Sequence, residues 1–247
     1  MAFNKKDALQ HNIDALQIAF ELDREQKQAT VGQRLLLKQY VGFGGLKFIL
    51  NRAKEEIDIN NWRKTDHPYF ELTQKLHQLI EANSADQLAY KEYVDSMRDS
   101  VLSAFYTPGP LINAIAEVLK ENDITINRML EPSAGAGAFI ENFSTILHTI
   151  PHIIAYEKDL LTGKVLQHIY PNIETHVRGF EEIPINQKGT YDLVASNIPF
   201  GTTSVFDPEY SRGKDSARAL ASKSIHNYFF LFFSYGVFVN GKEVWNS

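Results

Sequence analysis

The residues best suited to chemistry in this chain lie in one short turn, Ser196-Asn197-Ile198-Pro199-Phe200-Gly201. An apolar stretch from Tyr191 to Ser196 leads into the turn and predicts a strand that ends there. Asn197 offers a carbonyl acceptor, Pro199 stiffens the backbone because its φ is fixed, and Phe200 offers a flat apolar face. This combination of residues is suited to binding a planar amino group. The alternative is an ordinary β-turn, in which Asn and Pro are common.

A second motif follows another apolar stretch, Ile126 to Leu130, and reads Glu131-Pro132-Ser133-Ala134-Gly135-Ala136-Gly137-Ala138-Phe139. Its Gly-x-Gly lets a backbone approach a ligand closely, and the helical pattern that starts at Phe139 offers free N–H groups. The motif has neither the third Gly of the dinucleotide fingerprint nor the Gly-Lys-Ser/Thr of a phosphate loop. Its first residues, Glu131 and Pro132, favour a ligand that carries a positive amine or hydroxyl groups.

Alternating strands and helices are expected to position these turns. We expect strands near Ile126–Glu131, His152–Glu157, Ile173–Val177 and Tyr191–Ser196, and helices near Pro110–Glu121, Phe139–His148 and Asp159–Tyr170. This alternation predicts an α/β fold with a mainly parallel sheet covered on both faces, whose ligands bind at the carboxyl ends of the strands. Glu157 closes the second strand, where an acidic residue commonly takes ribose hydroxyls.

Residues 1–104 predict a helical N-terminal region, and residues 105–247 predict the α/β part. Apolar residues recur at helical spacing in three places: Leu9, Ile13, Leu16 and Phe20; Phe70, Leu72, Leu76 and Leu79; Leu88, Val94, Met97 and Val101. Thr30 and Gln33 have the spacing of a capping box. The glycines of the segment Gly42-Phe43-Gly44-Gly45 either cradle a phosphate or form a tight turn at a helix end.

The composition sets limits on function. A chain of 247 residues that is 44% hydrophobic can bury a core. It has no cysteine, and its eight histidines are scattered, so we expect neither disulfides nor a metal site. It lacks an apolar signal core and a membrane-length apolar run, so we expect a cytoplasmic protein. The net charge of −5 is the wrong sign for wrapping DNA, although the segment from Tyr210 to Lys223 carries four basic residues against one acid. That segment either lies along a DNA strand or is a solvated loop.

Taken in order, the motifs resemble those of the S-adenosylmethionine-dependent N6-adenine DNA methyltransferases. That family carries Phe-x-x-Pro, Asp/Glu-Pro-x-x-Gly-x-Gly, an acid after strand two, Gly/Asp-Phe after strand three and Asn/Asp-Pro-Pro-Tyr/Phe after strand four. The matching residues are Tyr106-Thr107-Pro108, Glu131 to Gly137, Glu157, Gly179-Phe180-Glu181 and Asn197-Ile198-Pro199-Phe200. The segment Val41 to Leu46 is also similar to one in large methylases of conjugative and phage-like elements, which implies a restriction-modification and mobile-element context.

The resemblance implies a Rossmann-like methyltransferase fold, S-adenosylmethionine as cofactor and a flipped adenine of DNA as substrate. It implies a catalytic role for Asn197, Ile198, Pro199 and Phe200. It implies cofactor binding by Tyr106, Thr107, Pro108, Glu131, Pro132, Ala134, Gly135, Gly137, Glu157, Phe180 and Asn197. The chain departs from the pattern at two positions. Ile198 replaces the first Pro of the usual pair, and Gly179 stands where many members carry an Asp that binds the adenine amino group of the cofactor. Glu181 is a candidate substitute for that Asp.

Two alternatives stay open at this point. Protein glutamine methylases share the Asn-Pro-Pro-Tyr turn, so another planar amide is a possible substrate. A non-catalytic remnant that binds only cofactor or DNA is the other alternative. The chain stops soon after an expected fifth strand near 236–239, before the antiparallel hairpin that usually ends the methyltransferase sheet. We therefore expect a truncated, split or degenerate member, or one that depends on a missing C-terminal region or a partner chain for target recognition.

Overall fold

The computed structural model describes residues 4–103, 107–148, 150, 152–183, 190–197, 223–224, 227–229, 238–239 and 242–243. The chain forms two compact units. The helical unit comprises Met1–Ala104 together with Asp159–Pro171, and the sheet unit comprises Phe105–Lys158 together with Asn172–Ser247.

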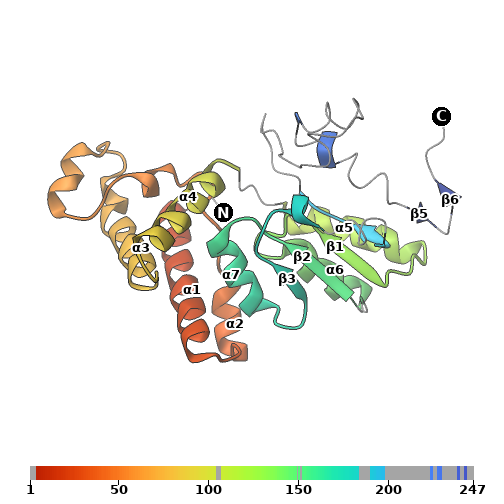
Figure 1. Ribbon diagram of the computed structural model, residues 1–247. Helices are drawn as coiled ribbons and strands as arrows, with labels where there is room; N and C mark the ends of the chain where they lie inside the picture. The colour runs from red at the N-terminus through yellow and green to blue at the C-terminus, as the bar shows by residue number, and fades with distance from the viewer. Residues whose placement is uncertain are drawn as a thin grey trace. The chain divides into compact units, whose positions relative to one another are not determined.

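The helical unit is built from five α-helices and three short 3₁₀ helices in its described part (Figure 1): α1 (Lys5–Glu25), α2 (Val31–Leu37), η1 (Lys47–Leu50), η2 (Glu56–Asn61), η3 (His67–Tyr69), α3 (Phe70–Ala82), α4 (Gln87–Ser103) and α7 (Leu160–Ile169). Helix α7 packs against α1, α2 and α4. The apolar face predicted for α1 is confirmed, because all four of its residues are buried. The capping box at Thr30 is also confirmed. The helix predicted from Leu88, Val94, Met97 and Val101 is confirmed as α4, although Leu88 in its first turn is 67% exposed.

The glycine-rich segment after α2 is a tight turn held by a side chain from α1. Gly42 and Gly45 have φ values of 68° and 76°, in the left-handed region that favours glycine. The fully buried Asn12 donates from Nδ2 to the Gly42 carbonyl at 2.6 Å and accepts the Val41 N–H at 2.9 Å. The side chain of Asn12 therefore occupies backbone groups of this turn, which is the structural role that the sequence left as one of two alternatives.

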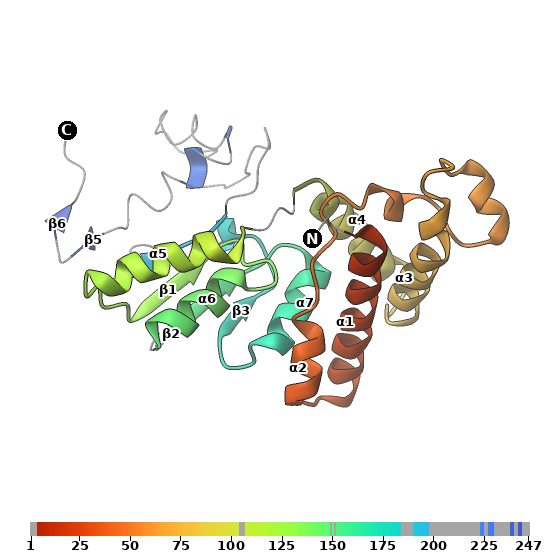
Figure 2. The same cartoon turned by 180° about the vertical axis from the view of Figure 1, so that it is seen from behind.

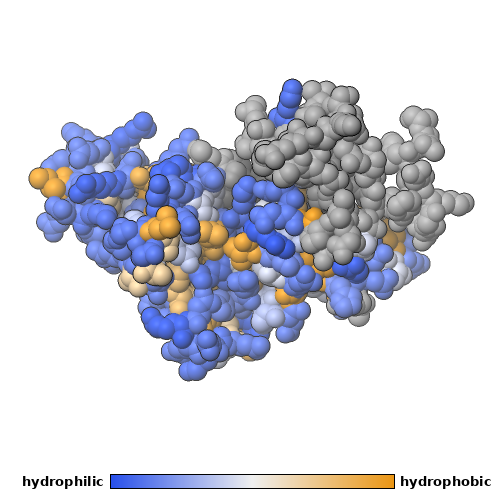
Figure 3. Space-filling view, viewed as in Figure 1, coloured by the Kyte–Doolittle hydropathy of each residue, from blue (hydrophilic) through white to orange (hydrophobic). Residues whose placement is uncertain are grey.

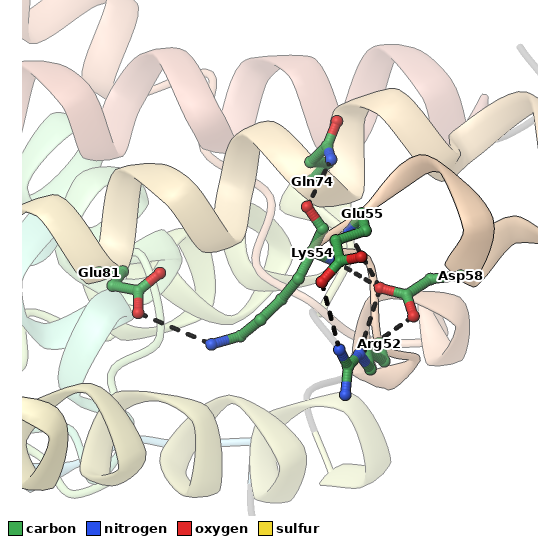
Figure 4. Close-up of polar contacts among 6 residues, drawn as sticks. All are labelled: Arg52, Lys54, Glu55, Asp58, Gln74 and Glu81. Atoms are coloured by element: carbon green, nitrogen blue, oxygen red, sulfur yellow. Dashed lines mark hydrogen bonds and ion pairs between the residues drawn. The ribbon is translucent and has the colours of Figure 1, made fainter.

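A buried carboxylate organises the segment that leads into α3 (Figure 4). Asp58 accepts the backbone N–H groups of Lys54 at 2.9 Å and Glu55 at 3.0 Å, and its carboxylate also pairs with Arg52 Nε at 3.0 Å. Hydrogen bonding, first of all from the Glu55 N–H, holds the pKa of Asp58 below its ordinary value of 3.8. The Lys54 carbonyl accepts from Gln74 of α3 at 3.0 Å, so this cluster ties the segment to the helix.

The sheet unit contains a four-stranded, all-parallel sheet with strand order β3-β2-β1-β4. Its strands are β1 (Arg128–Glu131), β2 (His152–Tyr156), β3 (Glu174–His176) and β4 (Leu193–Val194). Helices α5 (Gly109–Glu121) and α6 (Ala138–Leu147) pack against each other over one face of the sheet, as Figure 2 shows. A short 3₁₀ helix, η4 (Phe180–Glu182), follows β3. The α/β class and the parallel sheet that the sequence predicted are confirmed.

The strands are shorter than the sequence predicted, most of all β4, which comprises two residues. A buried cluster beside them contains Leu130, Ile154, Tyr156, Phe180, Ile183, Tyr191, Tyr228 and Phe229. The strand expected near 236–239 is present as β5 (Phe238–Val239), but it pairs antiparallel with β6 (Lys242–Glu243) and not with the parallel sheet. The described surface shown in Figure 3 is largely hydrophilic, with small apolar areas between. Among the described residues, no helix has the length and apolar character needed to cross a membrane.

Candidate functional site

The topology of the parallel sheet defines where a ligand would bind. From β1 the chain continues outward to β2 and then β3, whereas β4 returns to the other side of β1. The carboxyl ends of β1 and β4 therefore flank a topological switch point, the place where open α/β sheets bind ligands. The strand order is that of the Rossmann type. The two motifs that the sequence singled out follow these two strands.

The Gly-rich turn after β1 has the backbone that its glycines allow. Gly135 and Gly137 have φ values of 55° and 85°, both in the left-handed region. The Ala134 N–H donates to the Tyr156 carbonyl at the end of β2, at 2.9 Å, which fixes the turn over the neighbouring strand. Helix α6 starts directly after Gly137. Its first backbone N–H groups point toward the turn, and they have no hydrogen-bond partner within the helix.

Glu131 ends β1 with a buried carboxyl group. Its residue is 1% exposed, and its Oε2 atom has no hydrogen-bond partner among the described residues. Burial raises the pKa of Glu131 well above its ordinary value of 4.5, and the charge of Glu157 raises it further, whereas a hydrogen bond from the Ile140 N–H lowers it. A buried polar atom without a partner costs free energy, so this oxygen is suited to a ligand that donates a hydrogen bond.

Glu157, directly after β2, reaches the Gly-rich turn. Its Oε2 accepts the Gly135 N–H at 2.7 Å, and its own N–H donates to the His176 carbonyl of β3 at 3.0 Å. The predicted ribose-binding acid and the predicted Gly-x-Gly thus lie side by side. Pro132 and Ala134, also predicted at the site, are buried within the same turn.

Asn197 lies just beyond the end of β4. The register pairs Leu130 with Val194, and the Ala195 N–H donates to the Leu130 carbonyl at 3.1 Å. Asn197 therefore follows the strand end that stands beside Glu131. Its neighbour Ser196 has a buried hydroxyl with no hydrogen-bond partner among the described residues. The other predicted catalytic residues, Ile198, Pro199 and Phe200, lie outside the described residues, as do Tyr106 and the basic segment up to residue 222.

Thr107 and Pro108 directly precede α5, the helix that packs against α6. Pro108 is the N-cap of α5, and its carbonyl accepts the Leu111 N–H at 3.0 Å. A Cβ on Gly109 would lie 3.6 Å from Oδ1 of Asn142, which stands in the second turn of α6. The first residue of α5 thus lies beside the helix that follows the Gly-rich turn.

Phe180, predicted to line the adenine of the cofactor, is a core residue at 5% exposure. Its ring lies 3.9 Å from that of Phe229 and 5.4 Å from that of Tyr228, measured between ring centroids. Next to it, Glu181 pairs with Lys158 at 3.0 Å. No pattern in the sequence indicates Lys158, because its partner stands on the loop after a different strand and only the pairing of β2 with β3 brings the two loops together.

The described part of the chain was predicted to lack a metal site, and its potential metal ligands are dispersed. The His, Asp and Glu side chains described there do not gather in any group of three or more that could hold a metal ion. At the switch point, Glu131, Glu157 and Asn197 provide acceptor oxygens beside glycine backbone.

No protein-family model matches the chain. A curated relative, the defense against restriction protein B of Escherichia phage P1, is 29% identical over 118 residues. The match covers 46% of this chain and 5% of the relative, so the chain spans a small part of that protein.

Three solved structures are similar at low sequence identity. A candidate class I S-adenosylmethionine-dependent methyltransferase from Listeria monocytogenes has a TM-score of 0.45 at 12% identity, covering 94% of this chain and 70% of that one. A methyltransferase subunit of a type I restriction-modification system from Streptococcus thermophilus has a TM-score of 0.43 at 12% identity, covering 92% and 65%. A modification subunit of a candidate type I restriction enzyme from Vibrio vulnificus has a TM-score of 0.42 at 14% identity, covering 93% of this chain and 63% of that one. The fold assignment rests on the strand order described above.

Proposed function

We propose that this chain transfers a methyl group from S-adenosylmethionine to the N6 amino group of adenine in DNA. The observation that carries the proposal is the register of β1 and β4, in which Asn197 follows the strand end beside the Glu131–Gly137 turn. The order of the sequence motifs supports the same function. So does the likeness to a phage protein whose name refers to defence against restriction.

The residues at the switch point fit the proposed cofactor. Glu131 would meet the methionine amine, because a positive donor would satisfy the buried Oε2 atom and favour the ionised carboxylate. Gly135 and Gly137 would allow close approach, and Glu157 would take the ribose hydroxyls. When bound, S-adenosylmethionine supplies an electrophilic methyl group on a positively charged sulfur. The remaining predicted contacts are those of Tyr106, Thr107, Pro108, Pro132, Ala134 and Phe180.

The protein's part in the reaction is to position a weak nucleophile. The lone pair of the adenine amino group is delocalised into the ring, and inside a duplex it is out of reach, so the base must be flipped out. The Asn197 side-chain oxygen and the Ile198 carbonyl would accept the two N6 hydrogens, which favours a pyramidal nitrogen with its lone pair aimed at the methyl group. Phe200 would stack on the base, worth about 1–3 kcal/mol, and Pro199 would keep the turn stiff. As the new N–C bond forms, the bond between the methyl carbon and the donor sulfur would break and leave S-adenosylhomocysteine, and N6 would give up one proton to water.

The test is formation of N6-methyladenine. Unmethylated DNA is incubated with the chain and S-adenosylmethionine, and the digested nucleosides are analysed by mass spectrometry. Asn197→Ala is expected to lower the rate by on the order of 100-fold or more, as loss of one such hydrogen-bonding partner does in other enzymes. Its affinity for S-adenosylmethionine should stay within a few-fold of wild type. The matched control is Asn172→Ala, at an exposed position of the same unit.

Two other outcomes would each point to a different function. Methylation of glutamine in peptides, with DNA left unmodified, would favour the protein-methylating alternative. Full activity of Asn197→Ala would remove the catalytic assignment. Because the chain spans 5% of its curated relative, we also propose that target recognition is supplied by a further region or a partner chain, so the assay includes candidate partner chains as a separate arm.

A further inference from the structure

We propose that Ser96 of helix α4 is a positioning residue for the cofactor: it holds the first residues of α7, and through them the acid Glu157. This inference rests on the proposed function, in which Glu157 takes the ribose hydroxyls of S-adenosylmethionine. It gives the helical unit a part in cofactor binding.

The hydroxyl group of Ser96 joins α4 to the start of α7, two helices that pack against each other. Ser96 Oγ donates to Asp159 Oδ2 at 3.1 Å and accepts the Leu160 N–H at 2.8 Å. Asp159 is the N-cap residue of α7, and its Oδ1 accepts the Thr162 N–H at 2.6 Å. The first N–H groups of a helix have no partner within it, so Ser96 and Asp159 together satisfy two of these groups in α7.

The contact lies in a buried place, where its loss is costly. Asp159 is 8% exposed. Without the Ser96 hydroxyl, Asp159 Oδ2 and the Leu160 N–H would both lose this partner. A buried polar group that loses a hydrogen bond costs more free energy than the bond contributes on average. We therefore expect the first residues of α7 to shift when the hydroxyl is removed.

Two peptide bonds separate this contact from the acid of the cofactor site. Asp159 begins the second segment of the helical unit, and Glu157 stands two positions earlier, in the sheet unit. Glu157 accepts the Gly135 N–H at 2.7 Å and donates its own N–H to the His176 carbonyl at 3.0 Å. Because consecutive Cα atoms are about 3.8 Å apart, a displaced Asp159 draws on the backbone of Glu157 almost at once. Ser96 thus restrains Glu157 through the chain itself.

A second contact on α7 supplies a matched comparison. Tyr40 Oη and Thr162 Oγ1 lie 2.9 Å apart, and both residues are buried. This contact also holds α7 within the helical unit, but it is made by a residue farther along the helix from Glu157. We expect it to contribute to stability and not to cofactor affinity.

The experiment measures the affinity for S-adenosylmethionine by calorimetry with the full chain. Ser96→Ala is expected to weaken binding by about fivefold or more, the lower end of the usual coupling between linked sites. Ser96→Thr keeps a hydroxyl group and should restore the affinity of wild type. Tyr40→Phe should lower the unfolding free energy in urea and leave the affinity unchanged. Circular dichroism confirms that each variant is folded.

A double-mutant cycle separates positioning from a general structural effect. If Ser96 acts through Glu157, Ser96→Ala should have no further effect on affinity in the Glu157→Ala background, because the acid that it positions is gone. Losses of affinity that simply add in the double variant would overturn the proposal.

Hydrogen exchange at the Leu160 amide gives a reading that does not depend on binding by the Glu157 variant. Coupling between two sites is reciprocal, so bound S-adenosylmethionine should slow this exchange in wild type by about fivefold or more. The slowing should be absent from Ser96→Ala. An exchange rate in wild type that saturating cofactor leaves unchanged would contradict the coupling.

The results also separate this inference from the proposed function. Equal affinities of Ser96→Ala and wild type would overturn the positioning role and leave the cofactor site intact. Equal losses of affinity in Tyr40→Phe and Ser96→Ala would assign the effect to a general loosening of α7 and also overturn that role. Failure of the folded wild-type chain to bind S-adenosylmethionine would overturn both this inference and the proposed function.

Discussion

Replacing Glu131 by Gln should change how the stability of the chain depends on pH. Burial and the charge of Glu157 raise the pKa of Glu131 well above 4.5, whereas in the unfolded chain the same group titrates near that ordinary value. Between the two values the folded state holds one more proton than the unfolded state. The unfolding free energy therefore falls as pH rises through this interval, by up to about 1.4 kcal/mol per pH unit for one proton.

The Gln side chain of the variant does not titrate, so this decrease of the unfolding free energy with rising pH should be absent from Glu131→Gln. Urea unfolding of wild type and Glu131→Gln is measured at a series of pH values starting at 4.5, the ordinary glutamate value. The difference in unfolding free energy should shift in favour of the variant as pH rises. Asn113→Ala, at an exposed position of α5, is the control; because neither side chain titrates, it should give a difference that does not change with pH. If the curves of wild type and Glu131→Gln also ran parallel, the buried, proton-bearing carboxyl group would be refuted.

Three further predictions concern turns and buried groups of the two units. Asn12→Ala leaves the buried Gly42 carbonyl and the part-buried Val41 N–H without their side-chain partner, and should cost about 2–4 kcal/mol of unfolding free energy in urea titrations. A loss no larger than that of the exposed Gln17→Ala would contradict this prediction. Gly137→Ala forces a side chain into a φ of 85° and should cost about 1–2 kcal/mol in the same assay. Gly32→Ala, in helix α2 with open space around an added Cβ, should instead increase the unfolding free energy by about 1 kcal/mol. Equal changes in unfolding free energy for Gly137→Ala and Gly32→Ala would disprove the backbone strain at Gly137. Burial lowers the pKa of His77 below 6.5, so the unfolded chain is protonated at this residue before the folded chain as pH falls. The unfolding free energy should therefore decrease as pH drops below 6.5. His77→Gln should weaken this pH dependence, and an unchanged pH dependence in the variant would exclude His77 as its source.

The sequence predicted those features that depend on residues close together in the chain. The helical spacing of the α1 residues, the capping box at Thr30 and the alternation of strands and helices all follow from local patterns, and the structure contains them. The exposure of Leu88 in the first turn of α4 could not be predicted, because helical spacing does not tell whether another element covers that turn. The predicted length of β4 was wrong, because pairing with β1, and not apolar content, determines where the strand ends.

The candidate site was predictable for the same reason, and only in part. Glu131, the two glycines and Glu157 stand at strand ends that hydrophobic patterns locate, and the structure brings them together. The pairing of Lys158 with Glu181 joins loops 23 positions apart in the sequence and depends on the adjacency of β2 and β3. The unpartnered state of the Glu131 oxygen depends equally on packing around it. Neither is visible to a pattern read along the chain.

The measurement that tests the central claim most directly is the binding of S-adenosylmethionine to the purified chain, by calorimetry and by urea unfolding. We predict a single binding event, and a gain of about 2.7 kcal/mol in unfolding free energy when the ligand is at 100 times its dissociation constant. A chain that is folded by circular dichroism, yet gives no binding heat and gains no stability, would contradict the proposed methyltransferase site.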